Sequence, residues 1–134
     1  MVQAVAQAAG AEPGVILDLR RAADSGVAQL AQADGYIFAT PENLGSMSGL
    51  MKDFFDRTYY GVLEEKQGMP YALYVRAGLD GTGTMRAVDS ITTGLRWKPI
   101  CDPLLCKGDW NADFIDQAHD LGQLMATGLE AGVF

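Results

Sequence analysis

Residues 40–48, TPENLGSMS, combine residue types that could bind a ligand without supplying a catalyst. They include no histidine or cysteine, and Glu42 is their only carboxylate. Acid–base catalysis and metal binding both need further groups that this stretch lacks. Glycine lets a backbone approach a ligand closely, and proline fixes the direction of the chain. The stretch therefore favours a site where peptide groups hold a flat, polar, conjugated ring, and a well-capped connection from strand to helix without a ligand is the alternative.

A glycine-rich stretch, GLDGTGT at residues 78–84, begins at the last residue of the apolar run PYALYVRAG. It differs from the dinucleotide-binding fingerprint, and a few glycines alone are a weak signal. An ordinary turn explains this stretch about as well as a ligand contact does.

Short apolar runs alternate with segments of helical spacing along the chain. The apolar runs predict strands at residues 15–19, 35–40, 70–78 and 98–105. The helical spacing predicts helices at about 2–9, 25–33, 48–60, 85–97 and 111–130. Such alternation is typical of an α/β fold with a mostly parallel sheet and helices on both faces. Ligands bind beyond the carboxyl ends of the strands in such sheets, where residues 40–48 and 77–84 would lie.

The composition fits one domain that spans residues 1–134. Hydrophobic residues make up 49% and charged residues 20%, and the net charge is −7. Negative charge repels phosphate backbones and anionic lipids, so we expect neither nucleic acid nor a membrane as partner. No apolar run approaches the roughly 18 residues of a membrane helix. No Lys or Arg precedes Arg20, so the charged start of a signal peptide is absent, and we expect a cytoplasmic protein.

The side chains that most often catalyse are few in this sequence. Cys101 and Cys106 match neither the CxxC redox spacing nor a zinc site, and an extended segment would hold them too far apart for a disulfide. His119, the only histidine, falls in the predicted last helix without a visible partner. The carboxylates are scattered and form no marked pair. We predict no catalytic side chain and no metal ion.

The stretch TPENLGSMSGLMKDFFDR, residues 40–57, resembles the TPEYNxSxPGxLKNxxD segment of flavodoxin-like NAD(P)H-dependent FMN reductases and quinone reductases. The matching positions are Thr40, Pro41, Glu42, Gly45, Ser46, Gly49, Lys52 and Asp56. Asn43 and Leu44 stand where that family usually has Tyr and Asn, and Ser48 replaces its proline. The resemblance extends over nearly the whole chain and is strongest at residues 34–57.

The resemblance implies a flavodoxin-like three-layer sandwich with a parallel sheet and with FMN as cofactor. In that family this segment wraps the isoalloxazine ring, largely through backbone contacts, and the loop at 78–84 corresponds to a second ring-binding loop. FMN carries the redox chemistry, NAD(P)H is the co-substrate, and a quinone or a similar small molecule accepts the electrons. The implied ring contacts are Thr40, Pro41, Glu42, Asn43, Leu44, Gly45, Ser46, Met47, Ala77, Gly78, Asp80 and Gly81.

Members of that family begin with a strand and a Ser/Thr- and Gly-rich loop that binds the FMN phosphate, ahead of the first helix. The comparison implies an N-terminally shortened domain in which the first strand is absent and four strands remain. Three interpretations stay open: a shortened flavoprotein, which we favour; direct pairing of the strands at 15–19 and 35–40; or a strand supplied by another chain. With direct pairing, FMN affinity should fall severely because the phosphate anchor is lost.

Two other functions are compatible with the sequence. One is a non-enzymatic, flavodoxin-type electron carrier that passes single electrons to a protein partner. The other is a flavin-free α/β interaction module, because the phosphate loop is absent. A homo-oligomer is compatible with all of these functions. Flavin absorbance separates the module from the other two, and turnover of NADPH with a quinone separates the reductase from the carrier.

Overall fold

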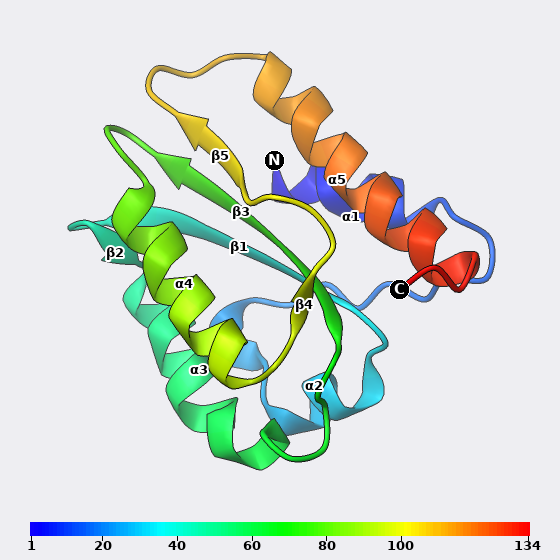
Figure 1. The fold of residues 1–134 in the computed structure, drawn as a ribbon. Helices are drawn as coiled ribbons and strands as arrows, with labels where there is room; N and C mark the ends of the chain where they lie inside the picture. The colour runs from blue at the N-terminus through cyan, green and yellow to red at the C-terminus, as the bar shows by residue number, and fades with distance from the viewer.

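The computed structural model describes residues 1–134 and contains one sheet with helices on both faces (Figure 1). The sheet has five strands, which are β1 (Tyr36–Asn43), β2 (Ser46–Met47), β3 (Pro70–Ala77), β4 (Lys98–Pro99) and β5 (Leu104–Lys107). The helices are α1 (Val2–Gly10), α2 (Val27–Gln32), α3 (Gly49–Val62), α4 (Thr82–Gly94) and α5 (Asp113–Glu130), with a 3₁₀ turn η1 (Ala22–Asp24) before α2. This architecture confirms the predicted α/β fold.

Strand β3 lies at the centre of the sheet. Residues 36–41 of β1 pair with residues 71–76 of β3 in parallel, and β4 and β5 pair in parallel with its other side. The short β2 runs antiparallel to the last two residues of β1. Because β1, β3 and β5 run in the same direction, their carboxyl ends meet at one edge of the sheet, which we call the carboxyl edge.

Helices α3 and α4 cover one face of the sheet, and α1 and α5 cover the other (Figure 1). The larger core lies under α3 and α4 and is rich in aromatic rings. Phe38 of β1 stacks on Trp97 with 5.7 Å between ring centroids, and Phe55 of α3 lies 5.3 Å from Phe38. Aromatic rings bury the most apolar area per residue, so this cluster fixes how α3 packs on β1.

The helices lie close to their predicted positions. The main difference is α4, which begins at Thr82 instead of residue 85 and so starts within the glycine-rich stretch at residues 78–84. Two ion pairs form along α3, with Lys52 Nζ 2.6 Å from Asp56 and Arg57 Nε 2.8 Å from Asp53. No helix in the chain has the length and the apolar character needed to cross a membrane.

The predicted strand at residues 15–19 is wrong. These residues form no strand and pair with no other strand, and Ile16 is 96% exposed and Leu19 55% exposed. The run has the composition of a buried strand, but an extended segment becomes a strand only where a neighbour takes up its hydrogen bonds. Direct pairing of residues 15–19 with β1 therefore does not occur. Residues 36–41 of β1 have β3 as their only strand partner.

Two strand boundaries also differ from the prediction. Strand β1 continues through Pro41 to Asn43 instead of ending at Thr40. Proline lacks an N–H donor. Strand β1 tolerates this loss at Pro41 because residues 36–41 pair with a neighbouring strand on one side only. The predicted strand at 98–105 is divided into β4 and β5, which leaves Asp102 and Pro103 outside the ladder.

Candidate functional site

The hairpin that joins β1 to β2 forms the first part of the carboxyl edge. Its turn consists of Leu44 and Gly45, whose φ angles are +53° and +79°. Two successive positive φ angles are typical of the type I′ turn in two-residue hairpins. The Leu44 side chain is fully exposed, and a positive φ is unfavourable for leucine. Such local strain is often found in functional loops.

Partly buried hydrogen bonds fasten this hairpin to α3. The Thr40 hydroxyl accepts a hydrogen bond from the backbone N–H of Ser48 at 3.0 Å and donates to the Pro41 carbonyl at 2.8 Å. The Ser48 hydroxyl accepts from the Met51 N–H at 3.2 Å and so caps α3. The Met47 side chain is buried in the larger core. The base of the hairpin is therefore rigid, and only its tip is exposed.

The loop from β3 to α4, residues 78–81, forms the second part of the carboxyl edge. Gly81 is the N-cap residue of α4 and has a φ of +83°. This positive φ favours glycine, and a Cβ at this position would force the Leu105 side chain of β5 to shift. Asp80 accepts a hydrogen bond from the Thr82 hydroxyl at 2.6 Å, which holds the loop against the start of the helix.

Glu42 connects the hairpin to this second loop. Its Oε1 accepts a hydrogen bond from the Gly81 N–H at 3.0 Å, and its Oε2 accepts one from the Thr84 hydroxyl at 3.1 Å. Nearby, the Gly45 carbonyl lies so close to Gly83 that no side chain would fit at residue 83. Residues 40–48 and the glycine-rich stretch at 78–84 therefore lie side by side at the same edge of the sheet, as the parallel topology predicts.

The predicted ring contacts differ in exposure. Exposed at the carboxyl edge are Pro41, Asn43, Leu44, Gly45, Gly78 and Asp80; half-buried are Glu42 and Ser46; buried are Thr40, Met47, Ala77 and Gly81. Gly45 and Gly78 have no heavy atom within 4 Å of the point where a Cβ would lie. A ligand could approach their backbone freely. The buried group supports the two loops from below.

Gly83 and Thr84 belong to this site but are not among the predicted residues. The Thr84 side chain is 0% exposed, and its hydroxyl reaches a partner 42 positions earlier in the chain. The alternation GTGT at residues 81–84 is the only signal of this role in the sequence. The spacing of residues in the sequence does not reveal that Glu42 is the partner of Thr84, because the two residues come close only when β1 pairs with β3.

The titratable groups with raised pKa values are buried tyrosines and cysteines. Burial, with a contribution from Asp34, raises the pKa of Tyr36 to about 12. Burial, with a contribution from Cys106, raises the pKa of Tyr74 to about 12. Burial also raises the pKa of the Cys101 and Cys106 thiols. Both thiols are free, and a raised pKa keeps them protonated and therefore weakly nucleophilic.

Arg76 is the cation nearest the end of β3, but its guanidinium is already bound. It donates to the carbonyls of Ala77 at 2.7 Å, Cys106 at 3.1 Å and Gly108 at 2.6 Å, and it lies 5.2 Å from the centre of the Phe114 ring. These contacts tie β3 to β5 and α5. Residues 1–10 include no Ser, Thr, Lys or Arg, and Gln3 and Gln7 carry their only side-chain hydrogen-bond donors.

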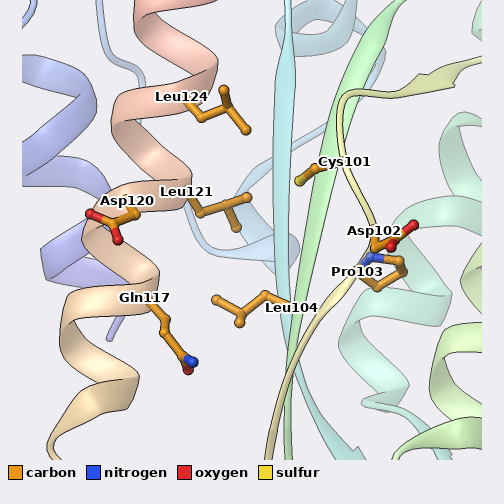
Figure 2. A pocket seen from close by; sticks show the side chains of 8 residues that line it. All are labelled: Cys101, Asp102, Pro103, Leu104, Gln117, Asp120, Leu121 and Leu124. Atoms are coloured by element: carbon orange, nitrogen blue, oxygen red, sulfur yellow. The ribbon is translucent and has the colours of Figure 1, made fainter.

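A cleft of about 300 Å³ lies elsewhere, between α5 and the connection from β4 to β5 (Figure 2). Leu121 and Leu124 of α5 point toward this connection, whereas Asp120 points away from it. The lining residues are Cys101, Asp102, Pro103, Leu104, Gln117, Asp120, Leu121 and Leu124. None of them belongs to the hairpin or to the 78–81 loop, so this cleft and the carboxyl edge are separate.

Comparison with known families finds a match over the part of the chain that contains the hairpin and the 78–81 loop. The sequence model of the NADPH-dependent FMN reductase family matches residues 20–99, which include both loops. The chain belongs to the NADPH-dependent FMN reductase family. The matched range contains β1, β2, α3, β3 and α4, the elements that place Glu42, Gly81 and Thr84.

Solved structures place this FMN reductase family member in the flavodoxin-like fold. A flavodoxin from the domain Archaea matches with a TM-score of 0.80 and 17% identity, over 96% of this chain and 87% of that one. An NADPH-quinone reductase from P. pentosaceus matches with a TM-score of 0.62 and 17% identity, over 93% of this chain and 88% of that one.

A longer protein, rubredoxin oxygen:oxidoreductase from Desulfovibrio gigas, matches with a TM-score of 0.77 and 14% identity. The match covers 98% of this chain and only 33% of that one. No protein with a curated description matches the chain. At these identities the structural matches confirm the predicted flavodoxin-like fold, and the family assignment depends on the sequence match.

Proposed function

We propose that this chain binds FMN by its isoalloxazine ring at the carboxyl edge, between the β1–β2 hairpin and the 78–81 loop. The observation that carries the proposal is the pair of hydrogen bonds from Gly81 and Thr84 to Glu42, which hold the two loops side by side. Open space next to the backbone of Gly45 and Gly78 supports the fit of a flat ring.

Exposed peptide groups would make most of the ring contacts. Asn43, Leu44 and Gly45 would contribute from the hairpin, and Gly78 and Asp80 from the second loop. The exposed Leu44 side chain would cover an apolar part of the ring and exclude water from it. The buried side chains of the predicted set keep these peptide groups in place, and a preorganised site binds its ligand at a lower entropic cost.

The proposed reaction is the transfer of a hydride from NADPH to a small electron acceptor such as a quinone. FMN, when bound, supplies the redox chemistry of this transfer. The residues of the two loops bind and orient the ring. We assign no side chain the role of acid or base, since Glu42 and Asp80 are the only carboxylates in the two loops and both accept hydrogen bonds there. We propose the cytoplasm as the place of this reaction.

Titration of the purified protein with FMN tests the proposal, followed by assay of NADPH oxidation with benzoquinone as acceptor. Quenching of flavin fluorescence and FMN-dependent oxidation of NADPH would both support it. FMN binding without NADPH oxidation would support a flavodoxin-type electron carrier instead. A folded protein that leaves the flavin spectrum unchanged would refute the proposed function.

A further inference from the structure

Glu42 connects the β1–β2 hairpin to the start of α4 through two hydrogen bonds, and we call this connection the brace. Both oxygens of its carboxylate accept hydrogen bonds, one from the Gly81 N–H of the second loop at 3.0 Å and one from the Thr84 hydroxyl in the first turn of α4 at 3.1 Å. The Thr84 side chain is completely buried, and Glu42 is half-buried. The carboxylate therefore points into the gap between the hairpin and α4.

These contacts resemble a helix-capping pattern, but the capping residue comes from strand β1 and not from α4. In a capping box, the side chain at the third helical position accepts a hydrogen bond from the N–H of the N-cap residue. In α4 the N-cap residue is Gly81, which has no side chain, and the third position is Thr84. Glu42 of β1 accepts the Gly81 N–H in place of a residue of α4. Its negative charge is also favourable near the N-terminus of a helix.

We propose that Glu42 is a positioning residue that holds the hairpin and the start of α4 at the spacing required for the flavin ring. The proposal rests on the proposed function. Contact between Gly45 and Gly83 limits how closely the two loops approach, and Glu42 prevents their separation. Without Glu42 the two loops would become ordered only when FMN binds, and the entropic cost of this ordering would lower the affinity for FMN.

The first test compares Glu42→Ala with Glu42→Gln. We expect Glu42→Ala to weaken FMN binding by roughly tenfold, the size of effect expected when a cap and its partner are lost. The glutamine side chain can accept from Gly81 through its oxygen and donate to Thr84 through its nitrogen, so we expect its FMN affinity within about threefold of wild type. Glu65→Ala, which removes an exposed carboxylate after α3, is the matched charge control and should leave affinity unchanged.

The second test changes the other partner. Thr84→Val keeps the shape of the side chain but removes the hydroxyl, and Thr84→Ser keeps the hydroxyl. We expect the valine variant to bind FMN more weakly and the serine variant to bind nearly as well as wild type. If the two residues act as one unit, Thr84→Val should add little to the loss caused by Glu42→Ala.

Hydrogen exchange of the Gly81 amide tests the brace without FMN. We expect exchange about tenfold faster in Glu42→Ala and close to the wild-type rate in Glu42→Gln, with both variants folded by circular dichroism. Unchanged exchange in Glu42→Ala, or equal loss of FMN affinity in the alanine and glutamine variants, would overturn the proposal. If the wild-type protein binds no FMN, the proposed function fails, and the exchange of Gly81 still decides whether Glu42 braces the loops.

Discussion

The carbonyl group of Gly45 lies against Gly83, so the β1–β2 hairpin and the first turn of α4 meet through main-chain atoms. A Cβ at residue 83 would occupy the position of the Gly45 oxygen. The spacing of the two loops is therefore set by backbone contact, which leaves little freedom for adjustment. A binding site for a flat ring needs such a fixed spacing.

Gly83→Ala should separate the two loops. We expect a loss of about 1–3 kcal/mol in the free energy of unfolding, because the collision involves backbone and not a flexible side chain. Gly78→Ala is the matched control, since no heavy atom lies within 4 Å of a Cβ at residue 78. Its free energy of unfolding should stay within about 0.5 kcal/mol of wild type. Urea denaturation measures both, and equal stability of the two variants would contradict the close approach.

Removal of the hydroxyl should lower the free energy of unfolding at Tyr36 but not at Tyr74. The buried Tyr74 hydroxyl has no hydrogen-bond partner, so Tyr74→Phe should leave stability unchanged or raise it. The Tyr36 hydroxyl donates to the Leu30 carbonyl at 2.7 Å, so Tyr36→Phe should cost about 0.5–1.5 kcal/mol. Urea denaturation of the two variants checks the difference. A larger loss in Tyr74→Phe than in Tyr36→Phe would contradict it.

Alkaline pH should destabilise the protein through the same two tyrosines. Their pKa values are raised to about 12 in the folded protein, whereas an unfolded tyrosine titrates near its usual value of 10.0. Below the unfolded pKa both states are protonated and stability is constant. Between about pH 10 and 12 only the unfolded state loses its protons, so stability falls, by about 2–3 kcal/mol per tyrosine at the upper end.

Unfolding free energies measured from pH 9 to 12 test this dependence. The decline should be shallower in Tyr74→Phe than in wild type, because one of the groups whose pKa folding raises no longer titrates. Identical pH profiles for the two proteins would show that Tyr74 does not carry the effect.

Prediction from sequence succeeded for helices whose local residue pattern alone determines their structure. The run of helical spacing predicted at about 48–60 forms α3, which begins at Gly49 directly after its cap Ser48. The apolar run at 15–19 has the same local character as β1, yet its neighbours in space decide its structure, and it forms no strand. Thr84 was missed for a similar reason, because its partner Glu42 is distant in sequence.

The cap of α3 can be tested by Ser48→Ala. This change removes the acceptor of the Met51 N–H, which lies 3.2 Å from the hydroxyl, and should cost about 1 kcal/mol. Ser48→Asp should retain most of the stability because aspartate also caps helices well. The matched control is Ser90→Ala, at an exposed position inside α4, which should be neutral or slightly stabilising. Thermal denaturation compares the three, and equal melting temperatures for Ser48→Ala and Ser90→Ala would argue against the cap.

The central claim is that peptide groups at the carboxyl edge hold the flavin ring, and titration of ¹⁵N-labelled protein with FMN tests it most directly. The account predicts that the largest changes in amide chemical shift occur at residues 42–45 and 78–81. Residues 101–104, which line the separate cleft beside α5, should change little. Shifts concentrated at residues 101–104, or no shift in either loop at saturating FMN, would contradict the claim.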